Sequence, residues 1–146
     1  LGGSEYLATV HGVVAGAPPR VDLDGEKRLV AALLAAIRAG HLASAHDCAD
    51  GGLAVALAEC CMADPDAWTG AEVDLSAWGA LPVRALLFGE AQGRIVVSTS
   101  NAAAVLAVAR EHGVPARAIG AVRAADAGLA LRVGERTWTA PIAALA

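Results

Sequence analysis

Apolar and polar residues recur with helical and strand periods along most of the chain. Ser4 can cap a short helix that ends near His11. A turn is predicted at residues 16–19, because the two prolines in that stretch cannot continue a helix. The first predicted element is therefore a short, separate helix.

A longer helix is predicted next, from a cap at Asp24 to a stop at Gly40. Its apolar side chains repeat at helical spacing and are expected to form the buried face. That face consists of Leu29, Leu33, Leu34 and Ile37.

The rest of the chain alternates strands with helices and ends in a hairpin. Strands are predicted at residues 42–46, 71–75, 94–98, 116–122, 129–133 and 137–139, and helices at residues 53–62, 82–88 and 101–112. This order indicates an α/β (α+β) fold with a mixed sheet and helices on both faces, in three-layer α/β/α form. We expect residues 1–146 to be a single domain.

Composition narrows the possible functions. Apolar residues make up 56% of the 146 residues and the net charge is −4, so the chain can build a core but has no electrostatic reason to bind nucleic acid or an anionic membrane. No apolar stretch predicts a transmembrane span or a signal peptide. The three cysteines, of which Cys60 and Cys61 are neighbours, form an odd and sparse set that favours reduced thiols and a cytoplasmic location. Because the first residue is Leu1, we expect the chain to be excised from a longer protein.

The most informative segment runs from Ser44 to Leu53 and places two carboxylates between a strand and a helix. Asp47 or Asp50 could hold Mg²⁺, and a following helix N-terminus rich in glycine suits phosphate. In the alternative interpretation, Asp50 caps the helix and Asp47 is an ordinary turn residue. The sequence leaves both open, but Asp50 is the better-placed cap.

A second candidate lies just before the strand at 94–98. Glu90, Gln92 and Arg94 alternate, so their side chains could face one side and bind a polar ligand. The alternative is a solvated loop with one surface ion pair. Elsewhere the sequence has no complete phosphate-binding loop, no Ser–His–Asp set and no zinc motif.

Three motifs together resemble a known family. LGGSEY, SAHDCADGGLAVALAE and LFGEAQGRIVVS occur in the order and spacing of the synthetase subunits of phosphoribosylformylglycinamidine synthase, in the C-terminal domain of the second half. The resemblance covers nearly the whole chain. The wider superfamily includes aminoimidazole ribonucleotide synthetase and selenophosphate synthetase.

The resemblance implies an ATP-dependent ligase of purine biosynthesis. In that family the formamide oxygen of formylglycinamide ribonucleotide is activated by ATP, and ammonia from a glutaminase subunit then displaces phosphate. It also implies N-terminal domains in the same chain, a small accessory subunit, and ATP or ADP with Mg²⁺ in the full-length enzyme. No catalytic residue is expected here, and the fragment alone is expected to be inactive and to form dimers or modest aggregates.

The resemblance assigns site residues position by position. Asp47 matches a Mg²⁺-binding position, and Ala49, Gly51 and Gly52 belong to the nucleotide-binding turn, although Ala49 lacks the hydroxyl of the family's Ser. A substrate-like site is implied at Glu90, Ala91, Gln92 and Arg94, with Ala91 in place of Ser. Two alternatives remain: a domain of a sister enzyme, or a non-catalytic nucleotide-binding scaffold domain.

Overall fold

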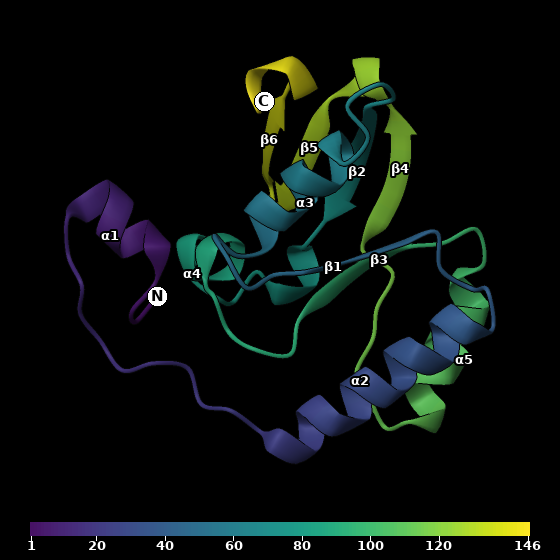
Figure 1. The fold of residues 1–146 in the computed structure, drawn as a ribbon. Coiled ribbons are helices and arrows are strands. Elements are labelled where there is room, and N and C mark those ends of the chain that lie inside the picture. The colour runs from purple at the N-terminus through teal and green to yellow at the C-terminus, as the bar shows by residue number, and fades with distance from the viewer.

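The structure, a computed structural model, describes all residues from 1 to 146. The chain forms five α-helices and six strands, and in Figure 1 α3 lies in front of the sheet that contains β2 and β5. The helices are α1 (Glu5–His11), α2 (Leu23–Arg38), α3 (Leu53–Met62), α4 (Val83–Phe88) and α5 (Ala102–Glu111). The strands are β1 (Ser44–Asp47), β2 (Thr69–Asp74), β3 (Ile95–Ser98), β4 (Gly120–Ala124), β5 (Leu129–Val133) and β6 (Arg136–Ala140).

The strands form two separate sheets. Strands β1 and β3 make an antiparallel pair, and the other four make a sheet in the order β4-β2-β5-β6. Strands β2 and β5 are parallel, whereas their other neighbours are antiparallel. The predicted α/β class and mixed sheet are confirmed.

The main core lies between the four-stranded sheet and helices α3 and α4. Pairing of Val73 with Leu131 places alternate residues of β2 and β5 on one face, and this face is buried. The core consists of Leu57, Cys61, Val73, Leu75, Leu86, Leu87, Leu129, Leu131, Val133 and Ile142.

No helix of the chain covers the opposite face of that sheet. The pairing places Glu72, Asp74 and Arg132 on this face, and ion pairs join Glu72 to Arg123 and Asp74 to Arg132. Charged side chains keep their hydration there, so this face needs no covering helix. The predicted helices on both faces are therefore not found on the four-stranded sheet.

Helix α2 packs differently from the prediction. Its buried residues are Ala32 and Ala36, and it packs against α5, where Ala109 is also buried. Small side chains let the two helices approach closely, which leaves Leu34 and Ile37 facing outward. The prediction that those two residues are buried was wrong.

Two boundaries also differ. The cap of α2 is Asp22, which accepts a hydrogen bond from the Gly25 N–H at 3.0 Å, and not Asp24. The strand predicted at 116–122 begins only at Gly120, where a Cβ would lie 2.0 Å from the Glu72 carbonyl oxygen. None of the helices has the length and hydropathy that crossing a membrane requires.

Candidate functional site

Asp47 is the last residue of β1 and its side chain is 68% exposed. It caps no helix, as the sequence predicted. Nε2 of the neighbouring His46 lies 3.4 Å from Oε2 of Glu59 in α3. This contact connects β1 to α3. Asp47 alternates with His46 along the strand and so belongs to the other face of the β1–β3 pair.

Asp50 does not cap α3, which corrects the prediction. The helix begins after Gly52, whose φ of 80° is in the left-handed region, and it has no side-chain cap. A Cβ at Gly52 would lie 2.8 Å from the Phe88 backbone, so only glycine lets α3 start against the end of α4. The Asp50 side chain is exposed instead.

Glu90 accepts three backbone hydrogen bonds, an arrangement that the sequence did not predict. Its carboxylate accepts from the Gly51 N–H at 2.8 Å and from the Glu5 N–H at 3.1 and 3.2 Å. The sequence contains no local signal for these bonds, because Glu5, Gly51 and Glu90 are far apart along the chain. The carboxylate thus holds α1 and the turn before α3 together.

The other residues of the Glu90 loop have separate roles. The Arg94 guanidinium donates to the carbonyl oxygens of Gly89 and, at 3.5 Å, of Ala91, so it supports the loop. The side chains of Ala91 and Gln92 are exposed and line a hollow. Of the three residues that could face one side, Glu90 and Gln92 both line the hollow, whereas Arg94 does not.

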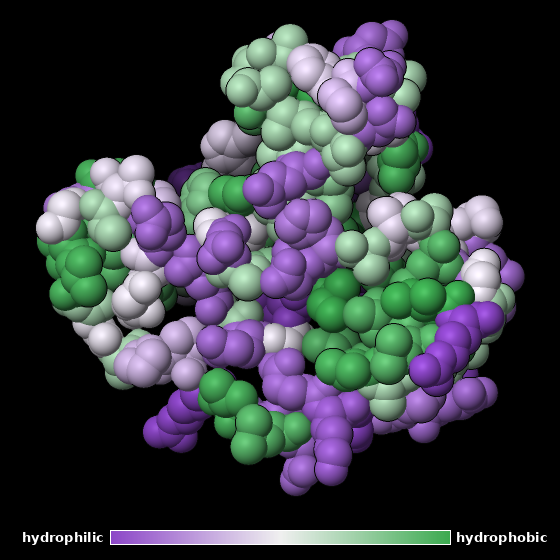
Figure 2. Space-filling view, viewed as in Figure 1, coloured by the Kyte–Doolittle hydropathy of each residue, from purple (hydrophilic) through white to green (hydrophobic).

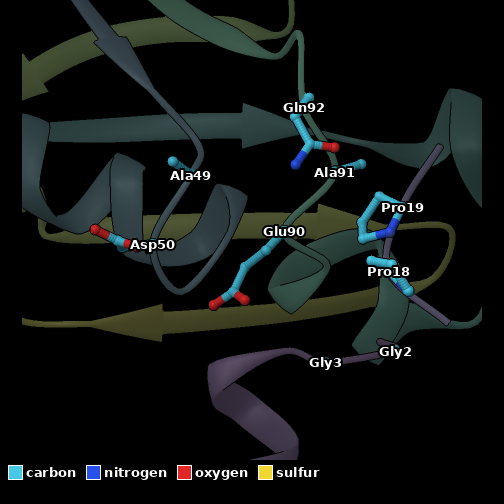
Figure 3. Close-up of a pocket in the computed structure, with 9 residues that line it drawn as sticks. All are labelled: Gly2, Gly3, Pro18, Pro19, Ala49, Asp50, Glu90, Ala91 and Gln92. Atoms are coloured by element: carbon cyan, nitrogen blue, oxygen red, sulfur yellow. The ribbon is translucent and has the colours of Figure 1, made fainter. Parts of the chain in front are cut away.

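The hollow joins the two predicted segments. It has a volume of about 350 Å³ and is lined by Gly2, Gly3, Pro18, Pro19, Ala49, Asp50, Glu90, Ala91 and Gln92. Figure 3 shows the Glu90 carboxylate between the Asp50 loop and the Gly2–Gly3 segment, with the Asp50 side chain pointing away from it. Asp47, Gly51, Gly52 and Arg94 do not line it. No site role was predicted for the glycines and prolines near the start of the chain, Gly2, Gly3, Pro18 and Pro19.

The charged residues that line the hollow are all acidic. Its lining includes two acidic residues, Asp50 and Glu90, and no basic residue. No group of three or more His, Cys, Asp or Glu side chains is placed to hold a metal ion. Asp47 offers a hard oxygen of the kind that Mg²⁺ prefers, but a single exposed carboxylate needs further ligands from outside this chain.

A buried thiol lies directly after Asp47. Burial raises the pKa of the Cys48 thiol, with a smaller opposing effect of the Arg94 guanidinium. The Cys48 N–H donates to the Arg94 carbonyl oxygen at 3.0 Å, which continues the pairing of β1 and β3. Cys48 is therefore a neutral core residue, and it anchors the turn that follows Asp47.

Comparison with known proteins gives consistent matches. The family model described as "AIR synthase related protein, C-terminal domain" matches residues 1–131. The chain is 48% identical over 139 residues to the phosphoribosylformylglycinamidine synthase subunit PurL of Moorella thermoacetica, which covers 94% of this chain and 18% of that protein. The corresponding subunit of Deinococcus radiodurans is 48% identical over 120 residues, covering 82% and 16%. The chain thus spans less than a fifth of the length of these relatives.

Solved structures share the fold. Thermotoga maritima PurL complexed with ATP superimposes with a TM-score of 0.74 at 22% identity, covering 99% of this chain and 23% of that one. The structure of PurLQS from the same organism gives a TM-score of 0.72 at 24% identity, covering 99% and 24%.

Proposed function

Because this chain belongs to the AIR synthase related protein, C-terminal domain family, we propose that it is the C-terminal domain of the second half of a PurL subunit. The observation that carries the proposal is the 48% identity to a PurL subunit over 94% of the chain. The hollow adds support, since it brings Ala49 and Asp50 of one family motif beside Glu90 of another.

In the full-length protein the proposed activity is that of an ATP-dependent ligase of purine biosynthesis in the cytoplasm. The formamide oxygen of formylglycinamide ribonucleotide takes a phosphoryl group from ATP, and ammonia then displaces phosphate to give the amidine. T. maritima PurL structures complexed with FGAR and with ATP support this substrate and this nucleotide. The T. maritima PurLQS structure supports a complex with further subunits. The partners proposed are the N-terminal domains of the same chain, a glutaminase subunit and a small accessory subunit.

This domain's proposed role is to bind nucleotide without carrying out the chemistry. Asp47 would provide one oxygen ligand to Mg²⁺, and phosphate oxygens of ATP or ADP would complete the metal's shell. Ala49 would contribute its backbone only. The three-layer α/β/α arrangement is proposed for the part around β1 and β3, where α3 contacts both strands.

A chimera tests the family assignment. This chain would replace the corresponding domain of the M. thermoacetica PurL subunit, and ATP-dependent conversion of formylglycinamide ribonucleotide would be measured with ammonia. We expect the chimera to be active and the 146-residue chain alone to hydrolyse no ATP. A chimera that folds but does not convert formylglycinamide ribonucleotide would favour a domain of a sister enzyme, such as aminoimidazole ribonucleotide synthetase or selenophosphate synthetase. ATP hydrolysis by the chain alone that Asp47→Ala abolishes would contradict the proposal.

Asp47→Asn in the full-length protein tests the metal role. Asn keeps the shape of the side chain and removes its charge, so we expect weaker retention of nucleotide and Mg²⁺ with an unchanged fold. Asp126→Asn is the matched control, because Asp126 is exposed and outside the site. If Asp47→Asn unfolds the domain and leaves nucleotide content unchanged, Asp47 is structural.

A further inference from the structure

Residues 1–17 form an N-terminal arm that hydrogen-bonds mainly to itself. The Gly3 N–H donates to the Ala15 carbonyl oxygen at 2.9 Å, and the Val13 N–H donates to that of Leu7 at 3.1 Å. Helix α1 within the arm has no buried residue. Figure 1 shows α1 at the side of the molecule, connected to α2 by a long loop.

Every hydrogen bond between this arm and the rest of the chain goes to Glu90. The arm's other marked attachment is the stacking of Tyr6 on Phe88, with ring centroids 5.1 Å apart. Phe88 is the last residue of α4, and Glu90 lies two residues further along the chain. The position of the arm therefore depends on one short segment and, for its polar contacts, on one carboxylate.

The same carboxylate changes what the hollow can bind. Glu5 and Gly51 do not line the hollow, but their backbone N–H groups are donors of the kind that a phosphate group needs, and the Glu90 carboxylate, which does line it, already occupies them. The lining also contains a second acidic residue, Asp50, whose side chain points away from Glu90, and no cation to balance a further negative charge. A phosphate group entering here would have to displace Glu90 against like charge.

We propose that Glu90 is a positioning residue that clamps the N-terminal arm onto the Gly51 turn, and that the hollow therefore accepts uncharged or cationic groups and excludes phosphate. The proposal does not depend on the PurL assignment, since it rests only on contacts within this chain. If the proposal holds, a nucleotide bound near Asp47 makes no hydrogen bond with the Gly51 N–H, because that group donates to Glu90.

Site-resolved amide hydrogen exchange in the 146-residue chain tests the clamp. Hydrogen bonds to a charged acceptor are strong, so we expect Glu90→Ala to speed exchange at the Glu5 and Gly51 amides by roughly tenfold or more. Glu90→Gln should have a smaller effect at the same two amides. Acetate should restore protection in Glu90→Ala, because it supplies the missing carboxylate. Glu135→Ala and Glu135→Gln are matched controls at an exposed turn, and they should change neither amide.

Titration with inorganic phosphate tests the exclusion. We expect the wild-type Glu5 and Gly51 amide resonances to stay unshifted and those of Glu90→Ala to shift with saturation. Saturable wild-type shifts at these amides would overturn the exclusion of phosphate. If amide exchange at Glu5 and Gly51 is unchanged in both Glu90→Gln and Glu90→Ala, the clamp is overturned. If Glu90→Ala does not fold, the exchange measured in Glu90→Gln alone decides whether the clamp exists. A failed chimera with intact clamp behaviour would count against the PurL assignment only.

Discussion

Asp74, at the end of β2, shows how one residue can link the fold to pH. Hydrogen bonds from Ser76 and then the nearby Arg132 guanidinium lower the pKa of its carboxyl group. The folded pKa is below the unfolded one, so in acid the unfolded chain binds more protons. The ionised Asp74 carboxylate therefore stabilises the folded state fully above the unfolded pKa of about 3.9. This stabilisation is lost as pH falls through the lower folded pKa.

We expect Asp74→Asn to remove this pH dependence. Urea denaturation midpoints of the wild type and the variant should differ at pH 6 and converge toward pH 2.5. Asp126→Asn is the control, since Asp126 takes part in none of these bonds. A constant difference between wild type and Asp74→Asn over this pH range would contradict the expected linkage.

At the level of single residues, the sequence predicted that Asp47 does not cap the following helix, but it did not predict the acceptors of backbone N–H groups. The cap roles given to Asp24 and Asp50 were wrong, because each was the nearest carboxylate to a predicted helix start and local spacing cannot choose between neighbours. Glu90 takes the Gly51 N–H from 39 residues away. Such a contact follows only from the tertiary fold.

Among the elements, helix α2 provides a direct test of its cap. Asp22 accepts from the Gly25 N–H, whereas Asp24 is in the first turn, where a negative charge only favours the helix dipole. We expect Asp22→Ala to lower the free energy of unfolding by about 1 kcal/mol. Asp24→Ala should cost less, roughly 0.3–0.5 kcal/mol. Chemical denaturation of the two variants measures the difference, and an equal or larger loss for Asp24→Ala would show that the cap is assigned to the wrong residue.

Elements with clear periodicity were predicted well. Asn101 caps α5 as expected, and β2, β5, β6 and α3 lie where the pattern placed them. The pairing of strands into two sheets was not predictable, because β1 pairs with β3 across 50 residues and periodicity says nothing about partners. The face of α2 was misjudged for a related reason. Helical spacing identified the apolar positions of α2, but the residues that are buried in the helix are the alanines Ala32 and Ala36.

For the whole molecule, the site depends on segments that only the complete fold brings together. Its lining comes from the start of the chain, the turn before α3 and the loop before β3. The sequence identified the last two as candidates through their carboxylates. The sequence did not predict that residues at the start of the chain complete the lining of the hollow, because glycines and prolines carry no side-chain chemistry that would indicate a site.

The exposed side of α2 has a consequence for the isolated chain. Leu23, Val30, Leu34 and Ile37 repeat at helical spacing on one face, and Leu34 and Ile37 are 41% and 50% exposed. Figure 2 shows hydrophobic surface gathered over the region of α2 and α5. Contiguous apolar surface of this kind favours association, because burial removes it from water.

We expect the 146-residue chain to show a monomer–dimer equilibrium that depends on this face. Leu34→Gln with Ile37→Gln should shift sedimentation toward monomer, while unfolding free energy changes by no more than about 0.5 kcal/mol per site, as for surface positions in general. Val122→Gln is the matched control, because Val122 is 57% exposed but lies on β4, in the four-stranded sheet. A wild-type chain that stays monomeric at high concentration would refute the expectation. Equal loss of association in Val122→Gln would place the contact elsewhere, since only the α2 variants remove the helical stripe.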